Sequence, residues 1–203
     1  MNHSPEELKD VLLQYAKTKL VGLDPGHDLN HAQRVLNNAL CLLCDEPCDT
    51  QVVIAASILH DAADHKFFDE EQSIHDMKLF LKDNGFSSDQ CSHVIKIITH
   101  LSFSKEIQGI ATDPTVEFCI VQDADRLDAI GAIGIARAFS YGGFRQRPFY
   151  STTEASTIDH FHEKLLLLPQ MMKTQAGRKM AEERKNFMLL FLSHFDAECQ
   201  PQP

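Results

Sequence analysis

Four short segments of the chain set histidines and aspartates beside apolar residues: HDLNHAQRV, LHDAADHKF, ITHLSFSKE and QDADRLDAIG. A polar side chain against a core is costly unless it is paired or binds a cation. His31 and His60 supply two imidazoles, while Asp61, Asp125 and Asp128 supply carboxylates. Two imidazoles and two of these carboxylates suit one divalent ion such as Mn, Fe, Co, Ni or Zn, and leave two octahedral positions for water and substrate. The segments therefore indicate a metal centre.

Each segment alone is weak evidence. A His-Asp dipeptide arises by chance, and the aspartates of QDADRLD would also suit a solvated helix face. Cys41, Cys44 and Cys48 form a C-x2-C-x3-C pattern, but no second cysteine pair follows at zinc-site spacing. Because the first two of these cysteines lie in the apolar run ALCLLC, we interpret them as buried thiols.

The elements that must position these residues are predicted to be helices throughout. Apolar residues recur at helical spacing along most of the chain, and no stretch alternates long enough for a strand, although VEFCIVQ comes nearest. Asp28 is the expected N-cap of the second helix, and Asn84-Gly85 is expected to end the fourth. The predicted helices cover residues 5–20, 29–43, 50–63, 69–84, 88–101, 115–139, 157–172 and 176–196, with a long loop over 140–157.

Length and composition indicate a globular protein. The chain has 203 residues, 43% of them hydrophobic, which is enough for one domain with a sizeable core. A formal net charge of −10 argues against binding a nucleic-acid polymer. The N-terminus is polar, so we expect no signal peptide, and no apolar run is long enough to span a membrane, so we expect no membrane partner. We therefore expect a reducing, cytoplasmic setting.

The order H…HD…D, seen as His31, His60-Asp61 and Asp125, resembles that of HD-domain metal-dependent phosphohydrolases. The segments HDLNHAQRV, LHDAADHKF, ITHLSFSKE and VQDADRLDAIGAIGIARAF are similar to those of small, single-domain, bacterial-type members. The pattern HF-x-EKLL…M…A…R…F, matched over residues 160–191, extends the resemblance to nearly the whole chain.

The resemblance implies metal ligands at His31, His60, Asp61 and Asp125. We expect one divalent ion, Mn in the first place, with Mg, Fe, Co, Ni or Zn as alternatives. The implied fold is an all-α, single-domain HD-type helical bundle over residues 1–203. Its metal-binding core is expected over about residues 20–140, with the loop 140–157 and the C-terminal helices 157–196 packing on it.

The implied reaction is hydrolysis of a phosphate ester or anhydride in a small phosphorylated compound. A nucleotide is the expected substrate, because the nearest members are similar to nucleoside triphosphate pyrophosphohydrolases. The adjacent histidines of two-metal phosphodiesterases are missing, so a single metal is favoured. Hydrolases of alarmones carry an acidic pair after the His-Asp dipeptide, but this chain has Asp64 and His65, which argues against that substrate.

Three residues are candidate catalytic groups beside the metal. Asp64 could orient or deprotonate a water whose pKa the cation lowers. His100 could protonate a leaving group or donate to a phosphate, and Asp128 could hold a ligand or a water. The candidate substrate-binding residues are His27, Lys66, Lys105, Arg145 and Arg147.

Three other readings compete with an enzyme that acts as a monomer or homodimer. A non-catalytic HD-fold signalling module that binds metal or nucleotide would keep the fold without turnover, but the full ligand set favours the enzyme. An HD-fold oxygenase with two irons would need further ligands. A helical scaffold for protein partners would need no buried ligands at all.

Overall fold

The computed structural model describes residues 4–20, 28–43, 47–62, 70–103, 106 and 114–199. Across these residues the structure is helical and contains no strand, so the predicted all-α fold is confirmed. The chain divides into two compact units, Met1–Asp125 and Arg126–Pro203, and each is described by itself. The expectation of a single domain over the whole chain stays a prediction.

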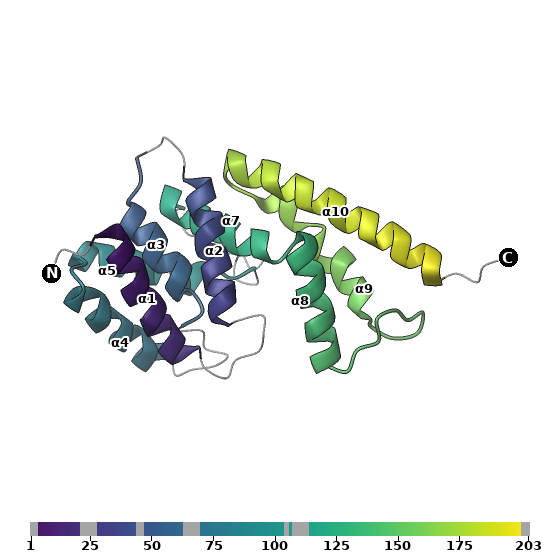
Figure 1. Ribbon diagram of the computed structural model, residues 1–203, viewed down its shortest axis with the longest axis horizontal. Helices are drawn as coiled ribbons and strands as arrows, with labels where there is room; N and C mark the ends of the chain where they lie inside the picture. The colour runs from purple at the N-terminus through teal and green to yellow at the C-terminus, as the bar shows by residue number, and fades with distance from the viewer. Residues whose placement is uncertain are drawn as a thin grey trace. The chain divides into compact units, whose positions relative to one another are not determined.

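The described residues of the first unit form six helices (Figure 1). They are α1 (Pro5–Lys19), α2 (Leu29–Leu42), α3 (Thr50–Leu59), α4 (Glu70–Asp83), α5 (Ser88–His100) and α7 (Val116–Asp128), of which the last three residues belong to the second unit. Asp28 caps α2 as predicted, and α4 ends before Asn84 as predicted, where Gly85 takes a φ of 91°.

The central element of the first unit is α3. Every residue from Val52 to Leu59 is buried, because α1, α2 and α5 all pack against this helix. The carboxylate of Asp49 caps its N-terminus by accepting the backbone N–H groups of Gln51 and Val52. An apolar helix held on several sides is a rigid support for whatever follows its C-terminus.

A second contact ties α3 to α7. The carboxylate of Glu117, near the start of α7, accepts the backbone N–H of Asp49 at 2.8 Å and lies 3.9 Å from His93 Nε2. Burial raises the pKa of Glu117, but the Asp49 N–H and the other hydrogen bonds outweigh burial and hold this pKa below its ordinary value. The ionised carboxylate therefore stabilises the folded unit.

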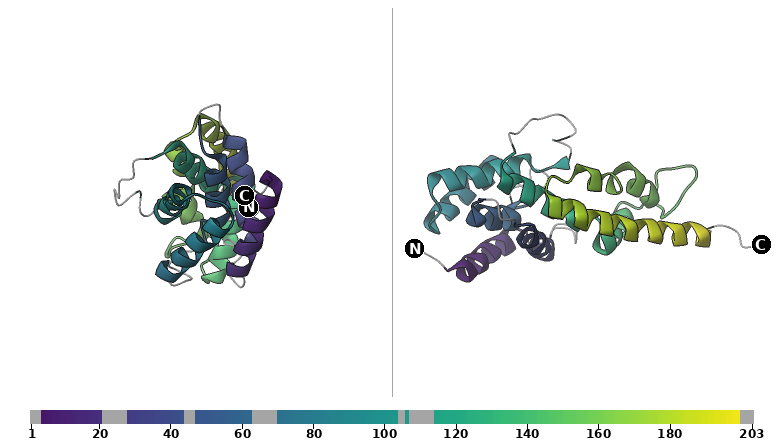
Figure 2. Two further views of the ribbon diagram at one scale, coloured as in Figure 1. Left: turned by 90° about the vertical axis from the view of Figure 1, so that its left-hand side faces the viewer. Right: turned by 90° about the horizontal axis from the view of Figure 1, so that it is seen from above.

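The second unit is built on the long helix α10 (Gln175–Cys199). Against it pack α8 (Gly131–Phe144) and the 3-10 turn η2 (Leu168–Met171), while α9 (Thr157–His160) runs directly into the π-helical turn η1 (Phe161–Leu165) (Figure 2). Phe139, Phe161, Phe191 and Phe195 form an aromatic cluster between these elements, with neighbouring ring centroids about 6 Å apart. None of the described helices combines the length and hydropathy that spanning a membrane would require.

Three predicted boundaries are wrong. The helix expected over 115–139 is two helices, because the chain breaks at Ala129 and Ile130 and Gly131 takes a φ of 74°. The loop expected from residue 140 begins only after Phe144, so its first residues are the end of α8. The helix expected over 157–172 is a chain of α-, π- and 3-10 turns. Helical periodicity runs through such breaks unchanged, which is why the sequence did not reveal them.

Two glycines of α8 give a direct test of its packing. A Cβ at Gly134 would lie 2.3 Å from the backbone oxygen of Ala129, whereas a Cβ at Gly143 would meet nothing within 4 Å. We expect Gly134→Ala to lower the free energy of unfolding by about 1–3 kcal/mol, because backbone must move. Gly143→Ala should raise it by about 0.5–1 kcal/mol, because alanine favours the helix. Calorimetric unfolding of both variants checks this, and equal shifts in the same direction would contradict it.

The lowered pKa of Glu117 predicts a pH dependence of stability. A carboxyl whose folded pKa is depressed stabilises the protein above its unfolded pKa, and that contribution is lost as the pH falls through the folded value. Glu117→Gln should therefore be less stable than the parent by about 1 kcal/mol near neutral pH. The difference should shrink below about pH 4.

Thermal melts across this pH range measure the effect, with Glu154→Gln as the control because Glu154 is exposed. A stability difference between Glu117→Gln and the parent that does not change with pH would refute the assigned role.

Candidate metal centre

His31 is placed by the capped start of α2. The carboxylate of Asp28 accepts the backbone N–H of His31 at 2.8 Å, which fixes the first turn of the helix. The His31 side chain then falls on the buried face of α2 and is only 2% exposed. A buried imidazole needs a partner for its ring nitrogens, so this position requires a specific contact.

His60 and Asp61 follow the last turn of α3. The Nδ1–H of His60 donates to the backbone oxygen of Ser57 at 2.9 Å. In a neutral imidazole the other nitrogen, Nε2, then carries the lone pair, as in a histidine ready to bind a metal. Both side chains are buried although they are polar.

Asp125 is presented by α7, which side-chain amides hold in place. Asn38 of α2 donates through Nδ2 to the backbone oxygen of Ala124 at 3.0 Å, one residue before Asp125. Gln122 donates through Nε2 to the backbone oxygen of Leu101, also at 3.0 Å, at the end of α5. Both amides are buried, so the position of Asp125 relative to α2 and α5 is closely determined.

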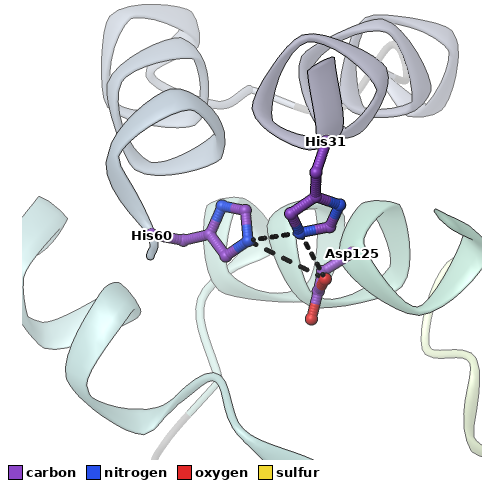
Figure 3. Close-up of side chains that lie close together, drawn as sticks. All are labelled: His31, His60 and Asp125. Carbon is purple, nitrogen blue, oxygen red and sulfur yellow. Dashed lines mark hydrogen bonds and ion pairs between the residues drawn. The ribbon is translucent and has the colours of Figure 1, made fainter. Parts of the chain in front are cut away.

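The three helices bring their ligand-type atoms to one point (Figure 3). Nε2 of His31 lies 3.0 Å from Nε2 of His60, and Oδ1 of Asp125 lies 3.5 and 3.8 Å from these two nitrogens. One ligand atom from each residue lies within 4.8 Å of the other two. The side chain of Asp125 is 34% exposed, so the cluster opens to solvent on that side.

Asp61 completes the cluster with a buried, unsatisfied oxygen. Its Oδ2 has no hydrogen-bond partner, although it lies 3.4 Å from Nε2 of both His31 and His60. An unpaired buried carboxylate oxygen is strongly disfavoured. Ligands bound at about 2.1 Å lie about 3.0–3.4 Å from their neighbours in octahedral or tetrahedral geometry. The separations among His31, His60 and Asp61 fit donors that share one divalent cation, and Asp125 Oδ1 lies somewhat farther from the two imidazole nitrogens, at 3.5 and 3.8 Å.

Two of the candidate catalytic residues lie within the described chain. His100, at the end of α5, donates its Nδ1–H to the backbone oxygen of Lys96 at 2.9 Å and is not among the atoms clustered around His31. Asp128 is buried in the second unit, where its Oδ2 accepts a charged hydrogen bond from Arg137. Their catalytic roles stay predictions, as does that of Asp64, which lies outside the described residues.

Of the candidate substrate-binding residues, some lie within the described part of the chain and others do not. Arg145 and Arg147 are exposed residues of the second unit, and the Arg145 guanidinium lies over the Tyr141 ring at 5.9 Å. Their role as substrate contacts stays a prediction. His27, Lys66 and Lys105 lie outside the described residues, as does Cys44 of the cysteine pattern. The prediction that Cys41 is buried is wrong, because this residue of α2 is exposed.

The sequence did not reveal the residues that position the ligands. Asn38 acts through a contact between segments far apart in the chain, and Ser57 acts through its backbone oxygen. Asn38 offered one signal, because it is an amide buried among the core positions of α2. The partner of a buried amide cannot be identified from spacing alone.

Comparison with known proteins identifies the family of the chain. The family model for the HD domain matches residues 28–130, a range that contains all four ligand-type residues. The Bacillus subtilis protein YpgQ is 37% identical over 200 residues, which cover 95% of each chain. The crystal structure of YpgQ in complex with ADP matches with a TM-score of 0.78 and 35% identity, covering 94% of this chain and 97% of YpgQ.

A second solved relative is an HD-superfamily hydrolase from Bacillus thuringiensis. It matches with a TM-score of 0.80 and 33% identity, and covers 98% of this chain and 100% of its own. The family model, the extent of these matches and the motif residues agree. The chain therefore belongs to the HD-domain phosphohydrolase superfamily.

Proposed function

We propose that this protein is a metal-dependent phosphohydrolase that acts on a small phosphorylated compound, and that the compound is a nucleotide. One observation carries the proposal: Asp61 Oδ2 is buried without a hydrogen-bond partner beside two imidazole nitrogens. A divalent cation satisfies this oxygen and both nitrogens at once, whereas the two imidazoles alone lie 3.4 Å from the oxygen and make no hydrogen bond to it.

The residues that would hold the ion are His31, His60, Asp61 and Asp125. Nitrogen and oxygen donors without a thiolate suit Mn, Fe, Co, Ni or Zn. Among these we propose Mn, with Mg, Fe, Co, Ni or Zn as alternatives. When bound, such an ion lowers the pKa of water and polarises a phosphoryl oxygen.

Residues of the chain itself hold the proposed ligands in place and leave one side of the cluster open to substrate. The hydrogen bond from His60 Nδ1 to the Ser57 oxygen holds that ring in one orientation and tautomer. The buried helix α3 keeps His60 and Asp61 from shifting, and the partial exposure of Asp125 marks the side from which substrate enters. Asp64 is our candidate for orienting the attacking water, and His100 is our candidate for protonating the leaving oxygen.

A nucleotide is favoured as substrate because a relative that matches nearly the whole chain, YpgQ, has been solved with ADP. A polyphosphate needs local positive charge in a chain whose formal net charge is −10. The bound ion, with Lys66, Lys105, Arg145 and Arg147, is proposed to supply that charge. Among nucleotides we favour triphosphates, split by water into monophosphate and pyrophosphate.

The direct test is a panel of nucleoside mono-, di- and triphosphates and sugar phosphates, incubated with the purified protein and Mn²⁺. Orthophosphate and pyrophosphate are measured separately, since the ratio identifies the bond that breaks. We expect turnover of nucleotides, and a loss of at least about a hundredfold in kcat/KM in Asp61→Ala, because a ligand that supports several kcal/mol of catalysis is removed.

The matched control is Asp10→Ala, which removes an exposed aspartate from α1 and should keep full activity. Release of no phosphate from any compound by protein that carries its metal would contradict the proposed function. Full activity in Asp61→Ala would contradict the proposed site.

A further inference from the structure

Asp125 belongs to the last turn of α7, where a helix is held least firmly by its own hydrogen bonds. The final backbone oxygens of a helix have no N–H partner within it, and in α7 these oxygens belong to residues 125–128. The oxygens of Arg126 and Leu127 accept N–H groups only three residues further on, at 3.1 and 3.3 Å, as in a tight turn. A contact that holds this turn in place therefore also holds the backbone of Asp125.

Arg184 of α10 makes such a contact. Its guanidinium donates through Nη1 to the backbone oxygen of Leu127. Its aliphatic stem packs on Gly131, which takes a φ of 74° just after the end of α7; a Cβ added to this glycine would lie 3.0 Å from Arg184 Cγ. A cationic donor at a helix C-terminus completes a hydrogen bond and offsets the negative end of the helix dipole. Arg184 therefore stabilises the end of α7 in helical form.

Two further arginines of the second unit contact the same turn. The buried side chain of Arg126 donates through Nη1 to the backbone oxygen of Met171 at 2.9 Å. Arg137 of α8 pairs with the buried carboxylate of Asp128. Each of the three residues that follow Asp125 thus has a contact of its own within the second unit.

We propose that Arg184 is a positioning residue for Asp125, and that it acts through the backbone of the last turn of α7. The inference rests on the proposed metal centre, in which Asp125 is a ligand. The Asp125 side chain is 34% exposed, against 2% for His31, 4% for His60 and 12% for Asp61. Because fewer neighbours constrain this side chain, its orientation depends more on its backbone than that of the other three.

The test replaces the guanidinium and keeps the stem. Arg184→Met retains an unbranched chain against Gly131 but leaves the Leu127 oxygen without its cationic donor. We expect the dissociation constant for Mn²⁺, measured by isothermal titration calorimetry, to rise roughly tenfold, because contacts that orient metal ligands are worth about 10- to 100-fold in affinity. Arg184→Lys keeps a charged donor and should bind Mn²⁺ within about threefold of the parent.

Arg178→Met is the matched control. Arg178 lies on the same helix and also donates to backbone oxygens, those of Met172 and Lys173, each at 3.0 Å, but neither residue belongs to α7. We expect it to lower the melting temperature about as much as Arg184→Met does, and to change the Mn²⁺ dissociation constant by less than about twofold. A role of Arg184 in stability alone would leave the two variants alike in Mn²⁺ affinity.

Hydrogen exchange without metal supplies a second readout. Amides of residues 125–130 should exchange at least about threefold faster in Arg184→Met than in the parent, because the end of α7 opens more often. The same amides should exchange at the parental rate in Arg178→Met. Arg184→Gln, whose amide is too short to reach the Leu127 oxygen, takes the place of Arg184→Met in both measurements if that variant does not fold.

Three results would overturn the inference and leave the proposed function intact: Mn²⁺ affinity unchanged in Arg184→Met, an equal loss of affinity in Arg178→Met, or unchanged exchange over residues 125–130. A parent protein that binds no Mn²⁺ or other divalent ion would instead overturn the proposed metal centre, and the inference with it.

Discussion

A carboxylate oxygen buried against two imidazole nitrogens is the constraint on which the rest of this structure depends. Asp61 Oδ2 lies 3.4 Å from His31 Nε2 and 3.4 Å from His60 Nε2, and it accepts no hydrogen bond. Such an arrangement is unfavourable in a protein core, because the free-energy cost of desolvating the oxygen exceeds the gain from van der Waals contacts around it. A shared cation would resolve it, and the surrounding contacts keep the candidate donors in place.

The positions of the donors follow from how their helices are held. α3 is buried from Val52 to Leu59, so its C-terminal end cannot move without disturbing the core of the first unit. The start of α7 is fixed by the carboxylate of Glu117, which accepts the backbone N–H of Asp49. Near Asp125, α7 is fixed by the Asn38 amide, which donates to the backbone oxygen of Ala124. The ligand geometry is therefore determined by buried polar contacts between helices, and solvent reaches the cluster beside Asp125.

The sequence predicted what depends on residue type and local spacing. The all-α class, the Asp28 cap and the convergence of His31, His60 and Asp125 follow from periodicity, capping chemistry and the cost of buried polar groups. It did not predict the break at Ala129 and Ile130, since the apolar pattern continues across it. Nor did it predict Asn38 or the pairing of Asp128 with Arg137, because such contacts depend on how distant turns meet.

The most direct test of the central claim is anomalous diffraction from crystals of the protein grown with Mn²⁺. A single anomalous peak is expected about 2.0–2.3 Å from His31 Nε2, His60 Nε2, Asp61 Oδ2 and an oxygen of Asp125. Absence of a peak at this position, with manganese bound elsewhere in the same crystals, would contradict the account of the buried oxygen.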